Sequence, residues 1–388
     1  FLPSLLITCY HHHHSFSACL QDMVHIKPRI LCVGVAGIDY VASVDHFPKP
    51  DEKMRSDSLL IDGGGNAANT ACAIGRLNTY AEVAIASSAG NDANGDTIIK
   101  GLQKDDVDVR YVERFEGTSP FTYVISTNDA DNSRTCIHQR GNGCLTVNFA
   151  DKIPIDEFSA MHFDTRYPDA AVLLSRKCTE RNIPYSLDVE RPREGLVDLM
   201  SNATIVLCNS MYCDTILGQS ETQKTDAELV TRLRKVIADQ APRAELAVMT
   251  LGARGSCLIR MAQDLQSGDD LVILTDGDSE TTPTVTKRHG AIWCPVWRGC
   301  NIIDTTGAGD AFQGGFISAI WAYVASKGGT KVIKSTHLPM NDRVLAHSLR
   351  VGTRVATRKI EAPGARCGLP YIGDDIFLQS EFNALLEL

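Results

Sequence analysis

The sequence lacks long apolar runs, paired cysteines and any excess of positive charge. No stretch of 18 or more apolar residues occurs, so no transmembrane helix is predicted. The 13 cysteines form no C-x-x-C pair, which argues against a zinc site or a disulfide framework and for reduced thiols in an intracellular compartment, the cytoplasm or, if residues 1–28 are a transit peptide, a plastid. With 38 basic against 47 acidic residues the net charge is −9, which argues against binding to nucleic acid or to an anionic membrane. Any phosphate-binding site must therefore be local.

The glycine-rich loop at residues 304–310 is not one of the common nucleotide-binding loops. Its sequence, DTTGAGD, fits neither G-x-x-x-x-G-K-[ST] nor G-x-G-x-x-G. It follows an apolar pair and leads into residues 312–325, which are predicted to form a buried helix. Small and hydroxyl residues before a helix leave backbone N–H groups free to bind an anion at the positive end of the helix.

Asp310, the last residue of this loop, is unusual at an anion-binding helix end because its carboxylate would repel a phosphate. A carboxylate is useful there if it takes a proton from an acceptor molecule at that place. An anion site combined with one carboxylate is what phosphoryl transfer to an alcohol requires. The alternative is that Asp310 only caps the helix.

A second glycine-rich segment, DGGGNAAN at residues 62–69, precedes another predicted helix. Three glycines let the backbone approach a ligand closely. Asn66 and Asn69 are three residues apart at the helix start, so their amides face the same way and suit several neighbouring hydroxyls. The alternative is a flexible turn with an asparagine cap. Asp39 ends a predicted buried strand over residues 29–39, where open α/β sheets bind ligands, unless it is a solvated turn aspartate.

Length and composition suit one large α/β domain or two smaller ones. Residues 1–28 differ in character from the rest and are predicted to be an N-terminal extension, disordered or targeting. They read either as a truncated plastid transit peptide or as translated upstream sequence. Residues 29–375 are predicted to form the folded domain, and residues 376–388 a C-terminal tail.

Two segments depart from the βα rhythm of this domain. Residues 40–61 and 118–139 alternate like short strands and are predicted to pair as a small lid. Residues 262–292 show little hydrophobic order beyond 271–274 and are predicted to be a mobile surface hairpin or loop.

From about residue 160 the chain is predicted to alternate between strands and helices. The predicted strands are 160–163, 185–189, 205–208, 246–250 and 256–260. The predicted helices are 169–181, 194–200, 210–218, 226–238, 312–325 and 342–358.

Taken together, the two glycine-rich segments resemble the signatures of the pfkB, or ribokinase-like, carbohydrate kinase family. DTTGAGD followed by Ala-Phe resembles the C-terminal signature, and GGNAAN resembles the N-terminal one, in the right order and about 240 residues apart. The resemblance covers residues 29–375. The segments SRT at 133–135 and ERPRE at 190–194 are closest to the ketohexokinase branch, whereas TLGARG at 250–255 resembles the ribokinase branch.

This resemblance implies a three-layer α/β/α sandwich with a central, mostly parallel sheet and a small β-sheet lid. It implies transfer of the γ-phosphate of ATP, with Mg²⁺, to a hydroxyl of a sugar, with Asp310 as the general base. No Lys or Arg lies in the segment 64–69, which favours a neutral sugar, ketohexose-like (as fructose) or ribose-like. A nucleoside, a phosphosugar and an inactive regulatory role are the alternatives. A homodimer through the lid is implied as well.

The resemblance also implies roles for single residues. The N–H groups that bind the transferred phosphate would come from Gly307, Ala308 and Gly309. The sugar would be held by Asp39, Gly65, Asn66 and Asn69. ATP would be bound by Arg134, Asn209, Thr250, Gly252, Gly255, Thr305 and Gly364. Asp304 and the turn at Gly364 lie where relatives bind a monovalent cation such as K⁺. Asn209 is followed three residues later by Tyr212, where many relatives carry a magnesium-organising glutamate, and this departure argues against a ribokinase more than against a kinase.

Overall fold

The computed structural model describes residues 27–127, 134–218, 224–262, 271–275, 281–327 and 340–388. Nearly all of the predicted N-terminal extension, residues 1–28, and the turn at 128–133 therefore lie outside the described residues. Within them, no helix is both long and apolar enough to span a membrane.

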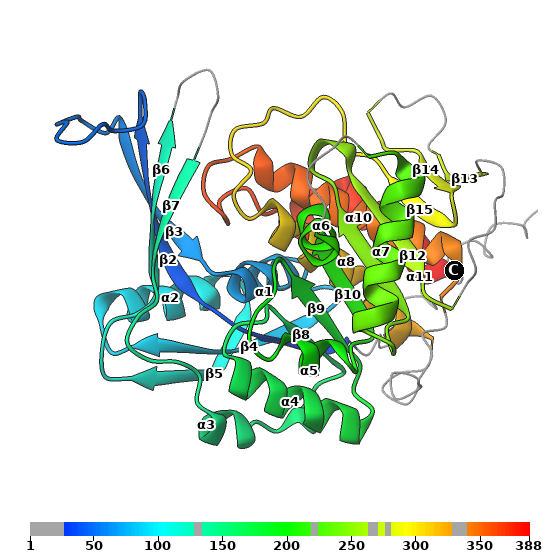
Figure 1. Cartoon of the computed structure of the whole chain (residues 1–388), viewed down its shortest axis with the longest axis horizontal. Helices are drawn as coiled ribbons and strands as arrows, with labels where there is room; N and C mark the ends of the chain where they lie inside the picture. Colours follow the sequence, from blue (N-terminus) through cyan, green and yellow to red (C-terminus); the bar gives the residue numbers. More distant parts are fainter. Residues whose placement is uncertain (1–26, 128–133, 219–223, 263–270, 276–280, 328–339) are drawn as a thin grey trace, which may run out of the picture.

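The larger of two sheets is mostly parallel. Its order is β13-β14-β15-β12-β11-β10-β9-β8-β1-β4-β5 (Figure 1). The parallel strands are β1 Arg29–Val33, β4 Glu82–Gly90, β5 Val107–Phe115, β8 Ala160–Phe163, β9 Tyr185–Val189, β10 Ile205–Asn209 and β11 Leu246–Thr250. The antiparallel strands are β12 Ser256–Arg260, β13 Leu271–Leu274, β14 Val285–Arg288 and β15 Ala291–Cys294.

Helices cover both faces of this sheet because neighbouring residues of each strand point to opposite sides. In β1, Ile30 and Cys32 pack into one core, whereas Leu31 and Val33 pack into the other. The first core is covered by α1 Asn66–Arg76, α2 Ala93–Lys104, α8 Ala308–Ser326, α10 Asp342–Ile360 and α11 Ile376–Glu387. The second is covered by α3 Val147–Asp151, α4 Pro168–Arg181, α5 Leu196–Met200, α6 Ser210–Leu217 and α7 Asp226–Gln240. The predicted three-layer sandwich is confirmed.

The smaller sheet, which we call the lid sheet, stands off the large one at the left of Figure 1. Its order is β3-β2-β6-β7, with bounds β2 Gly37–Val44, β3 Ser58–Gly64, β6 Phe121–Thr127 and β7 Arg134–Gln139. The single strand predicted over residues 29–39 is wrong. The chain changes sheets at Gly34, where a Cβ atom would lie 2.0 Å from the Asp164 carboxylate. Asp39 consequently belongs to the lid sheet.

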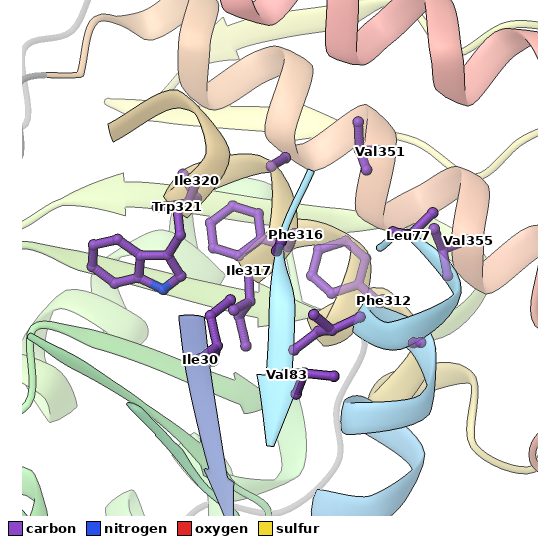
Figure 2. Close-up of a cluster of buried hydrophobic side chains, with 14 of the residues drawn as sticks. Ile30, Leu77, Val83, Phe312, Phe316, Ile317, Ile320, Trp321, Val351 and Val355 are labelled. Carbon is purple, nitrogen blue, oxygen red and sulfur yellow. The ribbon is translucent and has the colours of Figure 1, made fainter. Parts of the chain in front are cut away.

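Helix α8 is the centre of the first core and is buried on all sides from Asp310 to Ala325. Figure 2 shows Phe312, Phe316 and Trp321 of this helix packed among strand and helix residues. Its glycines allow two other helices to come close: a Cβ on Gly314 would lie 2.5 Å from Ala73 of α1, and one on Gly315 2.8 Å from Val355 of α10. This packing fixes the N-terminal end of α8 above the sheet.

Two predictions about the second half of the chain need correction. The prediction of a surface hairpin or loop over residues 262–292 is incomplete, because β13 and β14 pair antiparallel and, with β15, extend the large sheet. In β15, Ile292 packs into the first core and Trp293 into the second, but this alternation covers too few residues to predict a strand from the sequence. Residues 376–388, predicted as a tail, form α11, whose fully buried Leu378, Phe382 and Leu385 complete the first core.

Candidate active site

Asp310 lies in the first turn of α8 with its carboxylate buried. Asn69 Nδ2 of α1 donates a hydrogen bond to Asp310 Oδ2 at 2.8 Å, and the Thr70 hydroxyl donates to the Asp310 carbonyl at 3.4 Å. The N-cap of α8 is Gly307, and no side chain caps the helix. Asp310 is therefore not a capping residue, and one of its carboxylate oxygens is held by a side chain from the second glycine-rich segment.

The charge state of Asp310 is set by its surroundings. Burial, followed by the negative charge of Asp188, raises its pKa well above the ordinary aspartate value, and the hydrogen bond from Asn69 acts in the opposite direction. A carboxyl with a raised pKa binds a proton more readily than a free aspartate. This is the property that a proton acceptor in a catalytic site needs.

We expect the Asp310→Asn variant to be more stable to heat than the wild type, by an amount that grows with pH. Below the pKa that Asp310 has in the unfolded chain, its carboxyl is protonated in both the folded and the unfolded state. Above that pKa, the unfolded state releases the proton first, because the folded state has the higher pKa, and this lowers the free energy of unfolding of the wild type as the pH rises. An amide has no such penalty. Melting curves at about pH 5 and about pH 8 test this, with a gain of about 1 °C for each kcal/mol in a chain of this length. A gain that is the same at both pH values would contradict the raised pKa.

The turn before α8 presents backbone N–H groups at the helix end. Gly307 has a φ of 71°, and a Cβ on it would lie 3.0 Å from Ala365, so the turn needs glycine there. A Cβ on Gly309 would meet nothing within 4 Å, which shows open space above the helix. The Ala308 N–H already donates to the Thr305 carbonyl at 3.2 Å. In the described part of the chain, the N–H groups of Gly307 and Gly309 have no acceptor.

The glycine-rich segment before α1 approaches the backbone of the β1–β2 connection. Gly65, with a φ of 92°, is the N-cap of α1, and a Cβ there would lie 2.3 Å from the Val35 carbonyl oxygen. Asn66 Nδ2 donates to Asp188 Oδ2 at 3.2 Å and to Glu190 Oε1 at 3.0 Å. Asn66 thus donates to carboxylates of β9 and of the residue that follows it, and Asn69 donates to a carboxylate of α8. The structure therefore brings the start of α1, the end of β9 and the start of α8 together.

Arg366 was not predicted from the sequence, although it contacts both the helix residue Asn69 and the end of β3 at Gly64 and Asp62. Its side chain is buried; Nε donates to Asn69 Oδ1 at 2.9 Å and Nη2 donates to the Gly64 carbonyl at 2.8 Å. Its backbone N–H donates to Asp62 Oδ2 at 2.9 Å. Because Arg366 holds the oxygen of the Asn69 amide, the amide NH₂ group faces Asp310.

Asp39 covers this segment from the lid sheet. A Cβ on Gly64 would lie 2.3 Å from its carboxylate, so only glycine fits beneath it. Asp39 pairs in register with Asp62 of β3 and Thr122 of β6, and paired residues point to the same face of a sheet. Burial raises the pKa of Asp39, while Thr122 and Arg366 act to lower it. The face of the lid sheet that carries Asp39 is thus the face toward Asp310 and Asn69.

Two further carboxylates at the ends of parallel strands were also missed. Asp164, after β8, accepts the Val35 N–H at 2.9 Å and the Ala67 N–H at 3.2 Å, which ties β1 to α1. Burial, and then the charge of Glu190, raises the pKa of Asp188. An acidic residue at the end of an apolar strand was the signal in the sequence for Asp188.

Four of the residues predicted to bind ATP, namely Asn209, Thr250, Gly252 and Gly255, lie along the carboxyl edge of the same sheet. Asn209 caps α6 by accepting the Tyr212 N–H at 2.9 Å, and it pairs in register with Thr250 of the next strand. Gly255, with a φ of 88°, ends the short 3₁₀ helix Gly252–Arg254, and a Cβ there would lie 2.1 Å from the Cys294 carbonyl. Within the described residues, no hydrogen bond joins this group to Asp310.

Most of the chain matches one protein family: residues 27–371 match the pfkB family carbohydrate kinases. The chain belongs to this family. The family predicted from the two glycine-rich segments is confirmed, and the protein is a phosphotransferase that uses an alcohol group as acceptor.

Several members of this carbohydrate kinase family resemble the chain over nearly its whole length. Ketohexokinase of Mus musculus is 24% identical over 353 residues, which cover 88% of this chain and 97% of the relative. Ribokinase of Haemophilus influenzae is 22% identical over 348 residues, covering 89% and 96%. The structure of ribokinase from Giardia lamblia covers 92% of this chain and 100% of its own, with a TM-score of 0.71 and 17% identity, which supports the ribokinase-like fold.

Kinases of this family use ATP with Mg²⁺, and the carboxylates of this chain fit that ion. Mg²⁺ is bound in kinases by one or two carboxylates together with the substrate phosphates. Asp188 and Glu190 share the Asn66 amide, and their mutual repulsion contributes to the raised pKa of Asp188. In the part of the chain that the structure describes, no group of three His, Cys, Asp or Glu side chains could hold a metal ion.

Arg134 of the lid sheet reaches the loop before α8. Its Nη1 donates to Thr306 Oγ1 at 2.5 Å and lies 3.7 Å from Asp304 Oδ1. Burial acts to raise the pKa of Asp304, but hydrogen bonds from Thr306 and the positive charge of Lys359 outweigh it and lower that pKa. Arg134 therefore links the lid sheet to the turn that begins α8.

Proposed function

We propose that this protein is an ATP-dependent kinase that transfers the γ-phosphate to a hydroxyl of a neutral sugar, ketohexose-like (as fructose) or ribose-like. The observation that carries the proposal is the position of Asp310. It is a buried carboxylate with a raised pKa in the first turn of α8, where in the described residues the Gly307 and Gly309 N–H groups have no acceptor, and it is hydrogen-bonded to Asn69 of the second glycine-rich segment. A phosphate site and an alcohol site therefore meet at one proton acceptor.

The acceptor sugar would lie between the lid sheet and the start of α1. Asp39, Gly65, Asn66 and Asn69 line this place, and carboxylate and amide groups suit the hydroxyls of a sugar. Arg366 is the basic residue that the structure adds here, but two of its donors are engaged by Asn69 and Gly64. A neutral acceptor fits this donor set better than a phosphorylated one.

ATP would lie along the carboxyl edge of the large sheet, with its phosphates pointing to the start of α8. Asn209, Thr250, Gly252 and Gly255 would face the nucleotide, and Arg134, Thr305 and Gly364 would lie on the phosphate side. Asp188 and Glu190 would hold the Mg²⁺, which, when bound, neutralises charge on the phosphates.

In this mechanism Asp310 takes the proton of the sugar hydroxyl as its oxygen attacks the γ-phosphorus. Asn69 keeps one carboxylate oxygen of Asp310 in place, so that the other can face the acceptor. The N–H groups of Gly307 and Gly309, with the positive end of α8, stabilise negative charge on the transferred group. The lid sheet excludes water, which would otherwise hydrolyse ATP.

A panel of acceptors tests this proposal by ADP release. Fructose and ribose stand for neutral sugars, adenosine for nucleosides and fructose 6-phosphate for phosphosugars. We expect turnover with a neutral sugar. A preference for adenosine or fructose 6-phosphate would move the acceptor to those classes. ATP binding without turnover of any acceptor would favour an inactive, regulatory family member.

We propose that two copies pair through the outer face of the lid sheet. Ile61, Tyr40, Tyr123 and Ile137 form one row across its four strands and so share a face, opposite to the face that carries Asp39. Ile61, Tyr123 and Ile137 are each more than half exposed. An exposed apolar row of this kind is typical of an interaction surface.

The Ile61→Glu variant is expected to be monomeric, because a charge in this row would be buried unpaired at the interface, weakening association by about 10²-fold or more. Light scattering after size exclusion measures the mass of each species. Val197→Glu on α5, also an exposed apolar position, is the control and should stay dimeric. A wild type that runs as a monomer, or an Ile61→Glu variant that remains a dimer, would contradict the interface.

A further inference from the structure

The oxygens of Asp304, where a monovalent cation is expected by family resemblance, are already engaged by protein donors. Its Oδ2 accepts the Gly364 N–H at 2.8 Å. Its Oδ1 accepts the Thr306 N–H at 2.8 Å and the Thr306 hydroxyl at 2.6 Å. Arg134 adds a positive charge 3.7 Å from the same oxygen. The carboxylate thus has little capacity left to bind an ion.

A lysine ammonium lies at this place. Lys359, in the last turn of α10, has a fully buried side chain. Its Nζ donates to the Asp304 carbonyl at 2.7 Å and lies 3.5 Å from the Ala362 carbonyl. These two carbonyls belong to the loop before α8 and to the turn after α10, so one cationic group joins the two segments.

Backbone carbonyls next to a carboxylate are the ligands that hard cations prefer. An ammonium group carries the same charge as K⁺ and is of similar size, and it satisfies the same oxygens by hydrogen bonding. A K⁺ ion among these oxygens would lie within a few ångströms of the Lys359 ammonium, where like charges repel strongly because the site is buried. The residues present therefore do not fit an added monovalent cation.

We propose that Lys359 is a built-in cation that takes the place of a monovalent ion, so that the kinase works without K⁺. Lys359 acts as a positioning residue: it holds the loop at Asp304 against the turn that contains Gly364 and Ala365. Gly307, the N-cap of α8, lies so close to Ala365 that a Cβ atom on it would be only 3.0–3.2 Å from Ala365 atoms. The position of that turn therefore determines the position of the N–H groups at the start of α8. The inference rests on the proposed function only for its activity readout.

The first test uses the wild-type protein, exchanged into a buffer free of alkali cations and titrated with KCl or NaCl at constant ionic strength. Melting curves of the ligand-free protein should coincide for the two salts. The curves should coincide because a cation that does not bind the native state cannot raise its melting temperature. Sugar-dependent ADP release should likewise change by less than about twofold between the two salts. A melting temperature raised by several degrees in KCl alone, or activity that requires KCl, would overturn the proposal. If no acceptor is phosphorylated, the melting curves still decide the cation question.

The second test uses Lys359→Met, which keeps most of the side-chain volume and removes the charge. We expect its ADP release to fall by at least about tenfold, as for a misplaced oxyanion donor, and to recover on addition of K⁺ or ammonium chloride. Lys104→Met, an exposed lysine at the end of α2, should show neither effect. A Lys359→Met protein that is as active as the wild type without added cations would overturn the proposal. If that variant does not fold, the wild-type titration decides.

Discussion

Asp310→Asn is expected to fold like the wild type and to lose about three decades of kcat, the range seen when a general base is removed. The amide can still pair with Asn69 but cannot take the proton of the acceptor hydroxyl. KM for ATP should change little, because Asn209, Thr250, Gly252 and Gly255, which are assigned to the nucleotide, lie on elements other than α8. Steady-state ADP release with the best acceptor of the panel, together with circular dichroism, gives the measurement.

The matched control for this variant is Asp96→Asn. Asp96 also lies in the first turn of a helix, α2, but it is exposed and pairs only with Arg114 in the described structure. Its kcat should equal that of the wild type. An Asp310→Asn variant that keeps more than about a tenth of the wild-type rate would show that Asp310 is not the proton acceptor.

Among residues without a role in proton transfer, we expect Arg366→Met to lower both the stability of the fold and kcat the most. It would leave the Asn69 Oδ1 atom and the Gly64 carbonyl without their buried donors, at about 1–3 kcal/mol for each group. With its oxygen unheld, the Asn69 amide can rotate away from Asp310. A small misplacement of this kind costs about 10² in kcat.

Two measurements separate the effects of Arg366 on stability and on catalysis. Denaturant unfolding reports the loss of stability, and the pH dependence of kcat reports the state of Asp310, whose apparent pKa should rise when the Asn69 hydrogen bond is lost. Arg110→Met is the control, because Arg110 is largely exposed at the far edge of the large sheet. An Arg366→Met enzyme with the pH profile of the wild type would contradict the proposed link through Asn69.

The parallel strands at the centre of the fold could be predicted from the sequence because each is a short apolar run. The bounds of β8, β9 and β11 agree with the predicted ranges. Strands that are buried on both faces carry this signal without help from distant residues. By contrast, β14 is four residues long and only partly buried, and its place in the sheet depends on pairing with β15.

The candidate site could be predicted only where its residues stand together in the sequence. Asp310, Asn66 and Asn69 lie in two compact glycine-rich segments. Arg366 contacts Asn69 across 297 positions of sequence, and it stands in a turn with no pattern of its own. Lys359 looks like one basic residue among several at the end of an amphipathic helix, and only the fold shows that its ammonium is buried against Asp304. Contacts of this kind come from tertiary packing, which local sequence does not encode.

The central claim is that Asp310 stands between a phosphate site and an alcohol site. The most direct test follows the label of ATP carrying ³²P on the γ-phosphate, with the wild type and Asp310→Asn, in the presence and absence of the preferred sugar. We predict that the wild type transfers the label to the sugar, that little label appears as inorganic phosphate without sugar, and that Asp310→Asn transfers about 10³-fold less. Label released as inorganic phosphate at the same rate with and without sugar, or equal transfer by both proteins, would contradict this account.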